Sequence, residues 1–114
     1  MDIRSQEIQS KAIKFTMEED GKIVGRISLF FIVNDLHDEP YGLIEDVFVD
    51  DTQRGKGIGT LLIQHVIDEA KKHGCRKLIA QSRYGKNGIH LLYERLGFTD
   101  HGKNFRMDFV STND

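Results

Sequence analysis

"QRGKGIGT" occupies residues 53–60 and places glycine at three alternate positions, 55, 57 and 59. A strand-like run precedes this stretch and a long helical pattern follows it. Glycine costs about 1 kcal/mol relative to alanine inside a helix, so the stretch weakens the start of the helix. The first N–H groups of a helix lack intrahelical partners, and the helix dipole favours negative charge there. A strand, a glycine-rich turn and a helix start therefore predict an anion-binding site, in which glycine lets a phosphate approach the backbone.

Two common phosphate-binding motifs do not fit this stretch. A P-loop requires serine or threonine after its lysine, but Lys56 is followed by Gly57. The dinucleotide fingerprint G-x-G-x-x-G requires glycine where this chain has Thr60. A nucleotide-binding domain is therefore the weakest interpretation. The alternative without any ligand is a glycine-rich turn that permits tight packing of a helix on a sheet.

The residues around this stretch predict an α+β fold. Before it, residues 12–18 alternate between apolar and polar, "EDGK" at 19–22 is typical of a hairpin turn, and residues 30–33 are apolar on both faces, as in a deeply buried strand. The remaining predicted elements are a loop at 35–42, strands at 43–50, 77–82 and 104–110, and helices at 58–73 and 88–96. Asn87 is the expected cap of the second helix, and Gly74 and Gly97 are the expected helix ends. This order predicts a central mixed, mostly antiparallel sheet flanked by helices.

Length, charge and cysteine content exclude several classes. A chain of 114 residues with 39% hydrophobic residues is expected to form one domain, residues 1–114. Its net charge of -2 gives no basic field for nucleic acid. One cysteine, no signal-like N-terminus and no membrane-length apolar run lead us to expect a cytoplasmic protein without membrane contact. The histidines are scattered, so we expect no metal site.

Two motifs together resemble the GNAT superfamily, the acyl-CoA-dependent N-acetyltransferases. R-x-x-G-x-G is met by Arg54, Gly57 and Gly59, and "LLYERLGF" at 91–98 resembles the family's helix around a catalytic tyrosine. The resemblance covers about residues 42–110. It implies acetyl-CoA as cofactor, with the glycine turn and the helix start binding the pyrophosphate of coenzyme A. The implied cofactor-binding residues are Val47, Phe48, Val49, Arg54, Gly55, Lys56, Gly57, Ile58, Gly59, Thr60 and Asn87.

The resemblance also implies catalytic roles. Tyr93 matches the tyrosine that protonates the departing thiolate, although its helical spacing also fits a core residue. Amine acetylation needs a deprotonated amine, and Glu45 is the expected base, with Asp46 as the alternative. Strand alternation predicts that Glu45 shares a face with Val47 and Val49, and that Asp46 lies on the other. A backbone N–H among residues 47–49 is the implied donor to the acetyl carbonyl.

Two features depart from the family pattern. Lys86 stands where many members have a cofactor-binding asparagine, with Asn87 adjacent. Residues 17–25, "MEEDGKIVG", pass from strand to strand through a tight turn, so the usual N-terminal helical pair is expected to be missing. The acceptor site is then open, suited to a small amine or a protein amine, or it is completed by a second subunit in a homodimer. The rival hypothesis is a catalytically silent acyl-CoA-binding module that acts as a sensor or interaction domain.

Overall fold

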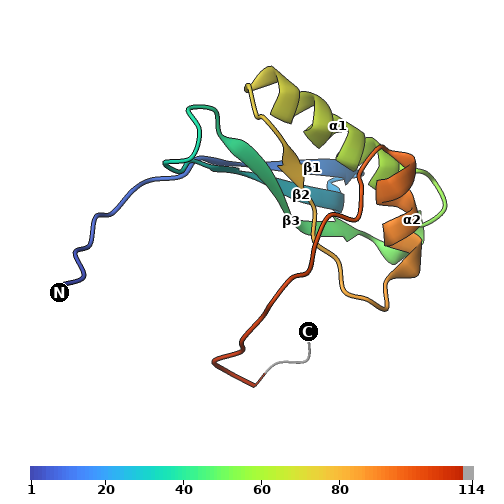
Figure 1. The fold of residues 1–114 in the computed structure, drawn as a ribbon. Coiled ribbons are helices and arrows are strands. Elements are labelled where there is room, and N and C mark those ends of the chain that lie inside the picture. The colour runs from blue at the N-terminus through green and yellow to red at the C-terminus, as the bar shows by residue number, and fades with distance from the viewer. Residues whose placement is uncertain (112–114) are drawn as a thin grey trace. The chain divides into compact units, whose positions relative to one another are not determined.

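The computed structural model describes residues 1–111 (Figure 1). The chain divides into two compact units, one formed by residues 1–80 and the other beginning at residue 81. The sequence-based expectation of a single domain over residues 1–114 stays a prediction. No helix in the described part of the chain is both long and apolar enough to cross a membrane.

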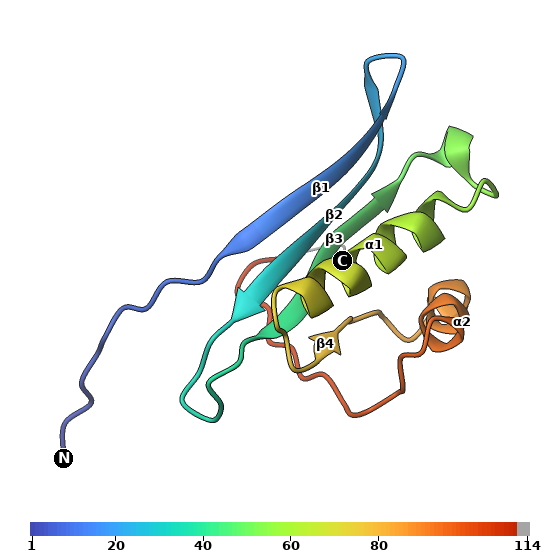
Figure 2. The ribbon, with the colours of Figure 1, turned by 90° about the horizontal axis from the view of Figure 1, so that it is seen from above.

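The first unit contains a four-stranded mixed sheet and one long helix. Its elements are β1 (Ala12–Glu19), β2 (Lys22–Ile32), β3 (Tyr41–Val49), the 3-10 helix η1 (Asp51–Gln53), α1 (Ile58–Lys72) and β4 (Leu78–Ile79). The strand order is β1-β2-β3-β4, with antiparallel pairing except between β3 and β4, which run parallel. Helix α1 lies along one face of this sheet (Figure 2). The predicted α+β class with a mostly antiparallel sheet is confirmed.

The first two strands form the tight hairpin that the sequence predicts. Asp20 and Gly21 both have positive φ, 52° and 78°. Such a pair in a two-residue turn matches the right-handed twist of the strands that it joins. The chain therefore passes from β1 to β2 without a helix between them, as the sequence indicated.

The hydrophobic core lies between the sheet and α1. Ile27, Leu29 and Phe31 of β2 are buried, together with Leu62, Ile63 and Val66 of α1. Gly25 allows the helix to approach, since a Cβ there would lie 3.0 Å from Leu62 Cδ1. The expectation that residues 30–33 are buried on both faces is wrong, because Phe30 and Val33 are exposed. The residues of β2 that alternate with the core, such as Ser28, form the opposite face, which we call the open face.

Strand β3 contains a bulge that resets its alternation. Its pairing with β2 passes from Glu45↔Ser28 directly to Phe48↔Arg26, so residues 46 and 47 lie opposite Ile27 alone. Asp46 has a φ of 54°. An extra residue in one strand shifts the period of two by one position, and Val49 then lies opposite Gly25 on the face covered by α1. Glu45 and Asp46 instead share the open face.

The predicted placement of Glu45 with Val47 and Val49, opposite Asp46, is therefore wrong. The physical reason is the inserted residue, which regular alternation does not anticipate. The first part of the strand, before the bulge, follows the expected alternation, with Ile44 buried and Leu43 on the open face.

Strand β4 is much shorter than the predicted 77–82. Within the described residues it pairs with β3 at Gly42 and Leu43 and nowhere else. Beyond Leu43, β3 continues for six residues with a ladder partner on its β2 side only. A parallel pair that ends so early leaves one edge of β3 without strand hydrogen bonds.

The second unit contains α2 (Asn87–Arg95). The helix ends as predicted, with Gly97 at a φ of 103° and the Phe98 N–H donating to the Tyr93 carbonyl at 3.0 Å. Lys86 occupies the N-cap without a side-chain cap, and Asn87 is the first helical residue, so the predicted cap is wrong.

The predicted closing strand at 104–110 is also wrong. These residues form no strand, and Phe105, Met107 and Phe109 are exposed. Alternation of apolar residues indicates a strand only where another strand supplies the ladder.

Candidate functional site

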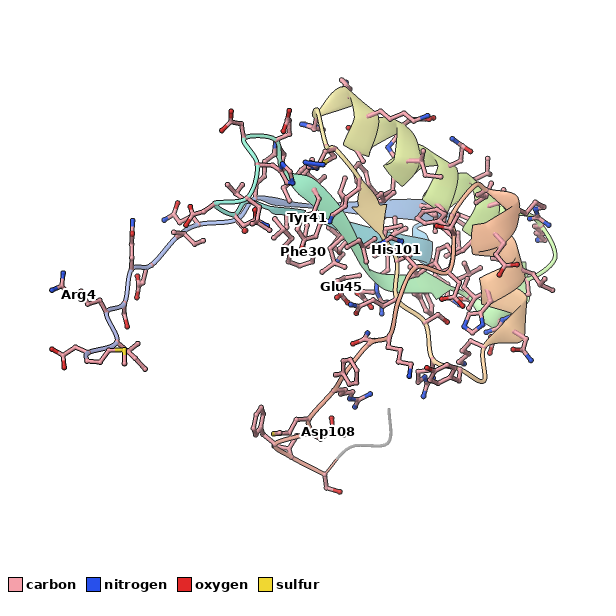
Figure 3. All side chains as sticks on the ribbon, viewed as in Figure 1. Arg4, Phe30, Tyr41, Glu45, His101 and Asp108 are labelled. Carbon is pink, nitrogen blue, oxygen red and sulfur yellow. The ribbon has the colours of Figure 1, made fainter. Side chains whose placement is uncertain are left out.

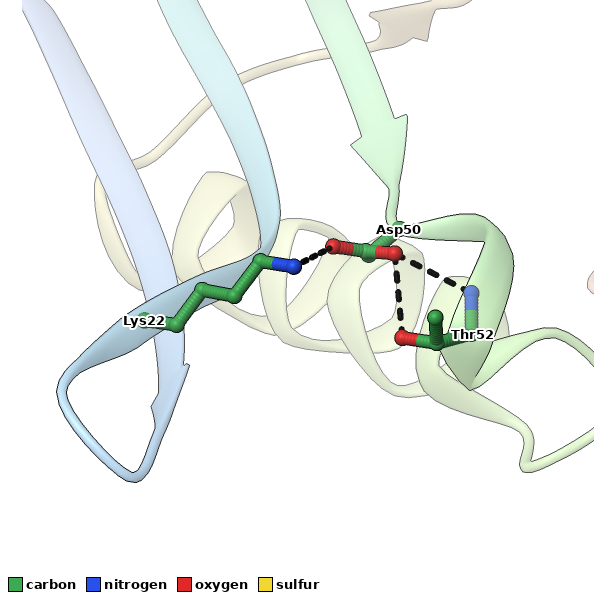
Figure 4. Close-up of polar contacts among 3 residues, drawn as sticks. All are labelled: Lys22, Asp50 and Thr52. Atoms are coloured by element: carbon green, nitrogen blue, oxygen red, sulfur yellow. Dashed lines mark hydrogen bonds and ion pairs between the residues drawn. The ribbon is translucent and has the colours of Figure 1, made fainter.

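The segment between β3 and α1 is anchored by Asp50 (Figure 4). Its Oδ1 accepts hydrogen bonds from the backbone N–H and the hydroxyl of Thr52, both at 3.0 Å. Its Oδ2 lies 3.0 Å from Nζ of Lys22, at the start of β2. These donors lower the pKa of Asp50, the Thr52 N–H most strongly. We call residues 50–57, between β3 and α1, the glycine loop. Its start is thereby held to the hairpin of β1 and β2.

The two cationic residues of the loop have partners within it. Gln53 is buried, and its Oε1 accepts a hydrogen bond of 3.2 Å from Lys56 Nζ. Arg54 is exposed, with Nε 2.9 Å from Asp51 Oδ1. Both positive charges therefore lie immediately before the start of α1, although each already contacts a loop residue.

The glycines of the loop have a local explanation as well as the predicted one. Gly55 and Gly57 have φ of 82° and 78°, which L side chains rarely adopt. No atom lies within 4 Å of a Cβ built at either position. Gly59, by contrast, is the second residue of α1, where a helical conformation by itself does not require glycine.

The first turn of α1 presents groups suited to an anion. Gly57 is the N-cap, its carbonyl accepts from Leu61 N–H at 3.0 Å, and no side chain caps the helix. The first turn has no acidic residue. The backbone N–H groups of Ile58 and Gly59 point out of the helix start, with the positive end of the dipole behind them. The surroundings of this helix start therefore fit a phosphate.

On the open face, the bulge is tied to the neighbouring strand. Arg26 donates from Nε to Asp46 Oδ2 at 2.8 Å and from Nη2 to Oδ1 at 3.1 Å. The Arg26 guanidinium also lies 4.5 Å from the centre of the Phe48 ring. The hydrogen bonds from Arg26 hold the pKa of Asp46 below its usual range, and the charge of Lys14 adds a smaller effect.

Glu45 lies beside a shallow hollow of about 420 Å³ on the same face. Phe30 and Glu45 project from the sheet opposite α1 (Figure 3). The hollow is lined by Ser28, Phe30, Ile32, Leu43, Glu45 and Asp46. The structure thus brings both candidate bases, Glu45 and Asp46, to one partly apolar surface.

The free edge of β3 carries backbone donors. Gly42 N–H donates to Lys77 carbonyl at 2.9 Å, which directs it toward β4. Asp50 N–H donates to Val24 carbonyl at 2.9 Å, toward β2. N–H groups alternate sides along a regular strand, and the bulge at Asp46 resets this alternation between Gly42 and Asp50. Counted back from Asp50, the N–H groups of Val49 and Val47 face away from β2, and that of Phe48 faces toward it.

Tyr93 and Asn87 belong to the second unit. Tyr93 is buried, and its ring packs edge-on against Phe98 with centroids 5.2 Å apart. Burial raises the pKa of the Tyr93 hydroxyl. Asn87 is exposed at the start of α2. The core packing that the helical spacing of Tyr93 suggested is therefore present.

Comparison with known proteins places the chain in a family. Residues 2–98 match the Acetyltransferase (GNAT) family, and the chain belongs to it. It is 35% identical over 95 residues to the glucosamine 6-phosphate N-acetyltransferase of Trypanosoma brucei brucei, covering 82% of this chain and 63% of that protein. It is 30% identical over 102 residues to the [ribosomal protein bS18]-alanine N-acetyltransferase of Escherichia coli strain K12, covering 90% of this chain and 64% of that protein.

A solved structure shows the same fold. The putative acetyltransferase from Agrobacterium tumefaciens str. C58 superposes with a TM-score of 0.79 at 28% identity, covering 85% of this chain and 68% of the other. The chain spans somewhat under two thirds of the length of the Trypanosoma and Escherichia relatives named above.

The sequence did not single out Arg26, Lys22 or Gln53. Lys22 and Arg26 are polar residues of β2 and Gln53 ends η1, and a solvated side chain is the ordinary interpretation of such residues. One signal for the bulge and its Arg26 partner was available in the sequence. It is the adjacent acidic pair Glu45 and Asp46 inside an apolar strand, since regular alternation would bury one of them.

Proposed function

We propose that this chain transfers an acetyl group from acetyl-CoA to a primary amine by direct attack in a ternary complex. The observation that carries the proposal is the glycine loop ending in an uncapped helix start without acidic residues, in a chain of the GNAT family. Diphosphate binding needs exposed backbone N–H groups and a positive potential, and this helix start offers both.

The cofactor is held mainly by backbone groups. The first-turn N–H groups of α1 bind the pyrophosphate, and the open space beside Gly55 and Gly57 lets it approach. Arg54 and Lys56 add positive charge from the loop. The full set is Val47, Phe48, Val49, Arg54, Gly55, Lys56, Gly57, Ile58, Gly59, Thr60 and, from the second unit, Asn87. Bound acetyl-CoA supplies an activated thioester, the acetyl donor.

The acetyl carbonyl is polarised by the free edge of β3. Val47 or Val49 donates its N–H to the carbonyl oxygen as negative charge develops there. Phe48 is the weaker candidate because its N–H faces β2. A fixed backbone donor of this kind typically contributes about 100-fold or more in rate.

Glu45 accepts the proton of the attacking amine, directly or through water. It is preferred to Asp46 because both Asp46 oxygens accept hydrogen bonds from Arg26 and the pKa of Asp46 is lowered. A weaker base takes a proton less readily. Tyr93 protonates the departing thiolate, since a tyrosine hydroxyl is protonated at neutral pH and burial raises its pKa further.

The acceptor is a primary amine of a small molecule or a protein. The two curated relatives are named for an amino-sugar phosphate and for a protein alanine. The hollow beside Glu45 is shallow and open, so it suits a substrate of either size.

The test measures thiol release from acetyl-CoA with a panel of amines, polyamines and peptides. We expect Glu45→Gln to lower kcat/KM about 100-fold, the usual scale for loss of a general base. Tyr93→Phe should lower kcat by about tenfold or more for loss of the acid. Tyr84→Phe is the matched control, because Tyr84 is exposed and has no assigned role, and it should match the parent.

Calorimetry with coenzyme A tests cofactor binding, and turnover then separates the two hypotheses. No heat of binding would overturn the proposal. Tight binding without turnover of any amine would favour the silent acyl-CoA-binding module. A Tyr93→Phe variant with the parent's kcat would remove Tyr93 from the mechanism.

A further inference from the structure

We propose that Arg26 is a positioning residue, whose two hydrogen bonds to Asp46 hold the β3 bulge in the conformation that directs the Val47 N–H away from β2. We call this contact the Arg26–Asp46 clamp. The expected effect on the rate rests on the proposed function, whereas the effect of Arg26 on the conformation of the bulge does not depend on it.

The bulge depends on an unfavourable backbone conformation. Asp46 has a φ of 54°, and outside glycine such values are uncommon. Aspartate and asparagine tolerate the left-handed region better than other L-residues, yet it remains less favourable than for glycine. A residue in this region persists where its surroundings hold it. In the described residues the side chain of Asp46 has its hydrogen bonds with Arg26 alone.

Arg26 contacts both the bulge and the residue that follows it. Its guanidinium forms a two-bond fork with the Asp46 carboxylate, at 2.8 Å and 3.1 Å. The same group stacks over Phe48, the residue that resumes regular pairing beyond the bulge and lies opposite Arg26 itself. A planar fork that also stacks on an aromatic ring is specific to arginine, and lysine cannot reproduce it.

The clamp acts on the Val47 N–H through one peptide bond. Rotation about the backbone of Asp46 turns the peptide plane that joins it to Val47, since that plane is rigid. The direction of the Val47 donor is therefore set by the conformation of Asp46. Such a change leaves the position of Glu45 unaltered, because Glu45 pairs with Ser28 in the regular ladder before the bulge.

Exposure separates a positioning role from a stabilising one. The side chains of Arg26 and Asp46 are 36% and 56% exposed. Ion pairs this open to solvent contribute little to the stability of the folded state. Loss of the clamp should therefore change the rate far more than the melting temperature.

The test compares Arg26→Gln with the double variant Arg26→Gln/Asp46→Gly. We expect Arg26→Gln to lower kcat about tenfold, below the loss for a missing donor, because the N–H is displaced rather than removed. KM for acetyl-CoA should stay within about twofold, since the pyrophosphate site is untouched. Adding Asp46→Gly should restore kcat to within about threefold of the parent, because glycine adopts a positive φ without the clamp.

Arg106→Gln is the matched control. Arg106 forms an exposed ion pair with Asp108 at 2.7 Å, outside the sheet. Its loss should leave kcat unchanged. If Arg26→Gln raised KM for the amine at constant kcat, Arg26 would be an acceptor-binding residue and the positioning role would be wrong. Failure of Asp46→Gly to restore any rate would also count against the clamp.

A second measurement does not require turnover. In ¹H–¹⁵N NMR spectra without cofactor, Arg26→Gln should shift the Val47 amide signal and leave the core amide of Val66 in place. An unmoved Val47 signal would overturn the clamp, whatever the enzyme does. A shifted signal in a chain whose parent acetylates no amine would support the clamp and count against the proposed function.

Discussion

Neighbouring residues of one strand lie on opposite faces of the sheet, and the two faces differ in burial and in the side chains that they carry. Leu29 in β2 is completely buried against the core, whereas Phe30, the next residue, is 38% exposed. The face covered by α1 contains apolar side chains and the close-approach glycines Gly25 and Gly42. The open face has the Arg26–Asp46 pair and Glu45. A face that contributes little packing can hold charged groups without desolvating them.

The largest expected effect contrasts the two faces directly. Leu29→Ala should destabilise the protein by about 3 kcal/mol, because it leaves a cavity in a close-packed core. Phe30→Ala should cost less than about 1 kcal/mol, as for a partly exposed side chain. The free energy of unfolding in urea measures both. Equal losses would show that the open face is covered in solution.

A smaller loss of stability is expected when a methyl group is added at a close contact on the face covered by α1. A Cβ at Gly42 would lie 2.8 Å from Leu78 Cδ1 and 2.9 Å from Leu29 Cδ1. Gly42→Ala should therefore destabilise by about 1–2 kcal/mol, since these side chains must move. Gly85→Ala is the control, because no atom lies within 4 Å of a Cβ there and φ is not positive. Gly42→Ala should melt at a clearly lower temperature than Gly85→Ala. Equal melting temperatures would contradict the close packing at Gly42.

Acid should weaken the open-face and loop contacts together. The pKa values of Asp46 and Asp50 are lowered by Arg26 and by Thr52 and Lys22, respectively. A carboxylate with a lowered pKa in the folded state stabilises it above the unfolded value, and this contribution is lost as pH falls through the folded value. We expect the free energy of unfolding to decline from about pH 4 downward. The decline should be smaller in Asp50→Asn, and an identical profile would contradict the assignment.

The smallest effect concerns thiol reactivity on either side of the sheet. Burial raises the pKa of Cys75, and its Sγ lies 3.7 Å from the Cβ position of Gly42. Because the thiolate is the reactive form, Cys75 should alkylate with iodoacetamide several-fold more slowly at pH 8 than a free cysteine. Ser28→Cys in a Cys75→Ala background places a thiol beside the open hollow and should react faster than Cys75. The reverse order would mean that the open face is the protected one.

Much of the fold was predictable from local pattern. The β1–β2 hairpin follows from Asp20 and Gly21, and α1 follows from apolar spacing and a glycine end at Gly74. These signals act over a few residues, so they can be read along the chain. The closing strand at 104–110 was predicted by the same alternation and is absent, because pairing requires a partner that alternation does not supply.

The candidate site was predicted in part. The glycine loop and the start of α1 lie where the motif indicated, and the positive φ of Gly55 and Gly57 gives those residues a local reason as well. The shared face of Glu45 and Asp46 was missed. One inserted residue at the bulge reverses every later side chain of β3, and the bulge is defined only by pairing with β2.

The sequence by itself determined the class of fold, the family and the position of the glycine turn before α1, because periodicity, turn residues and glycine motifs are local properties of the chain. The tertiary structure alone decided which face is covered, where β4 leaves β3, and how Arg26 meets Asp46, twenty residues away in the chain. Those features depend on register and on contacts between strands, which neighbouring residues do not specify.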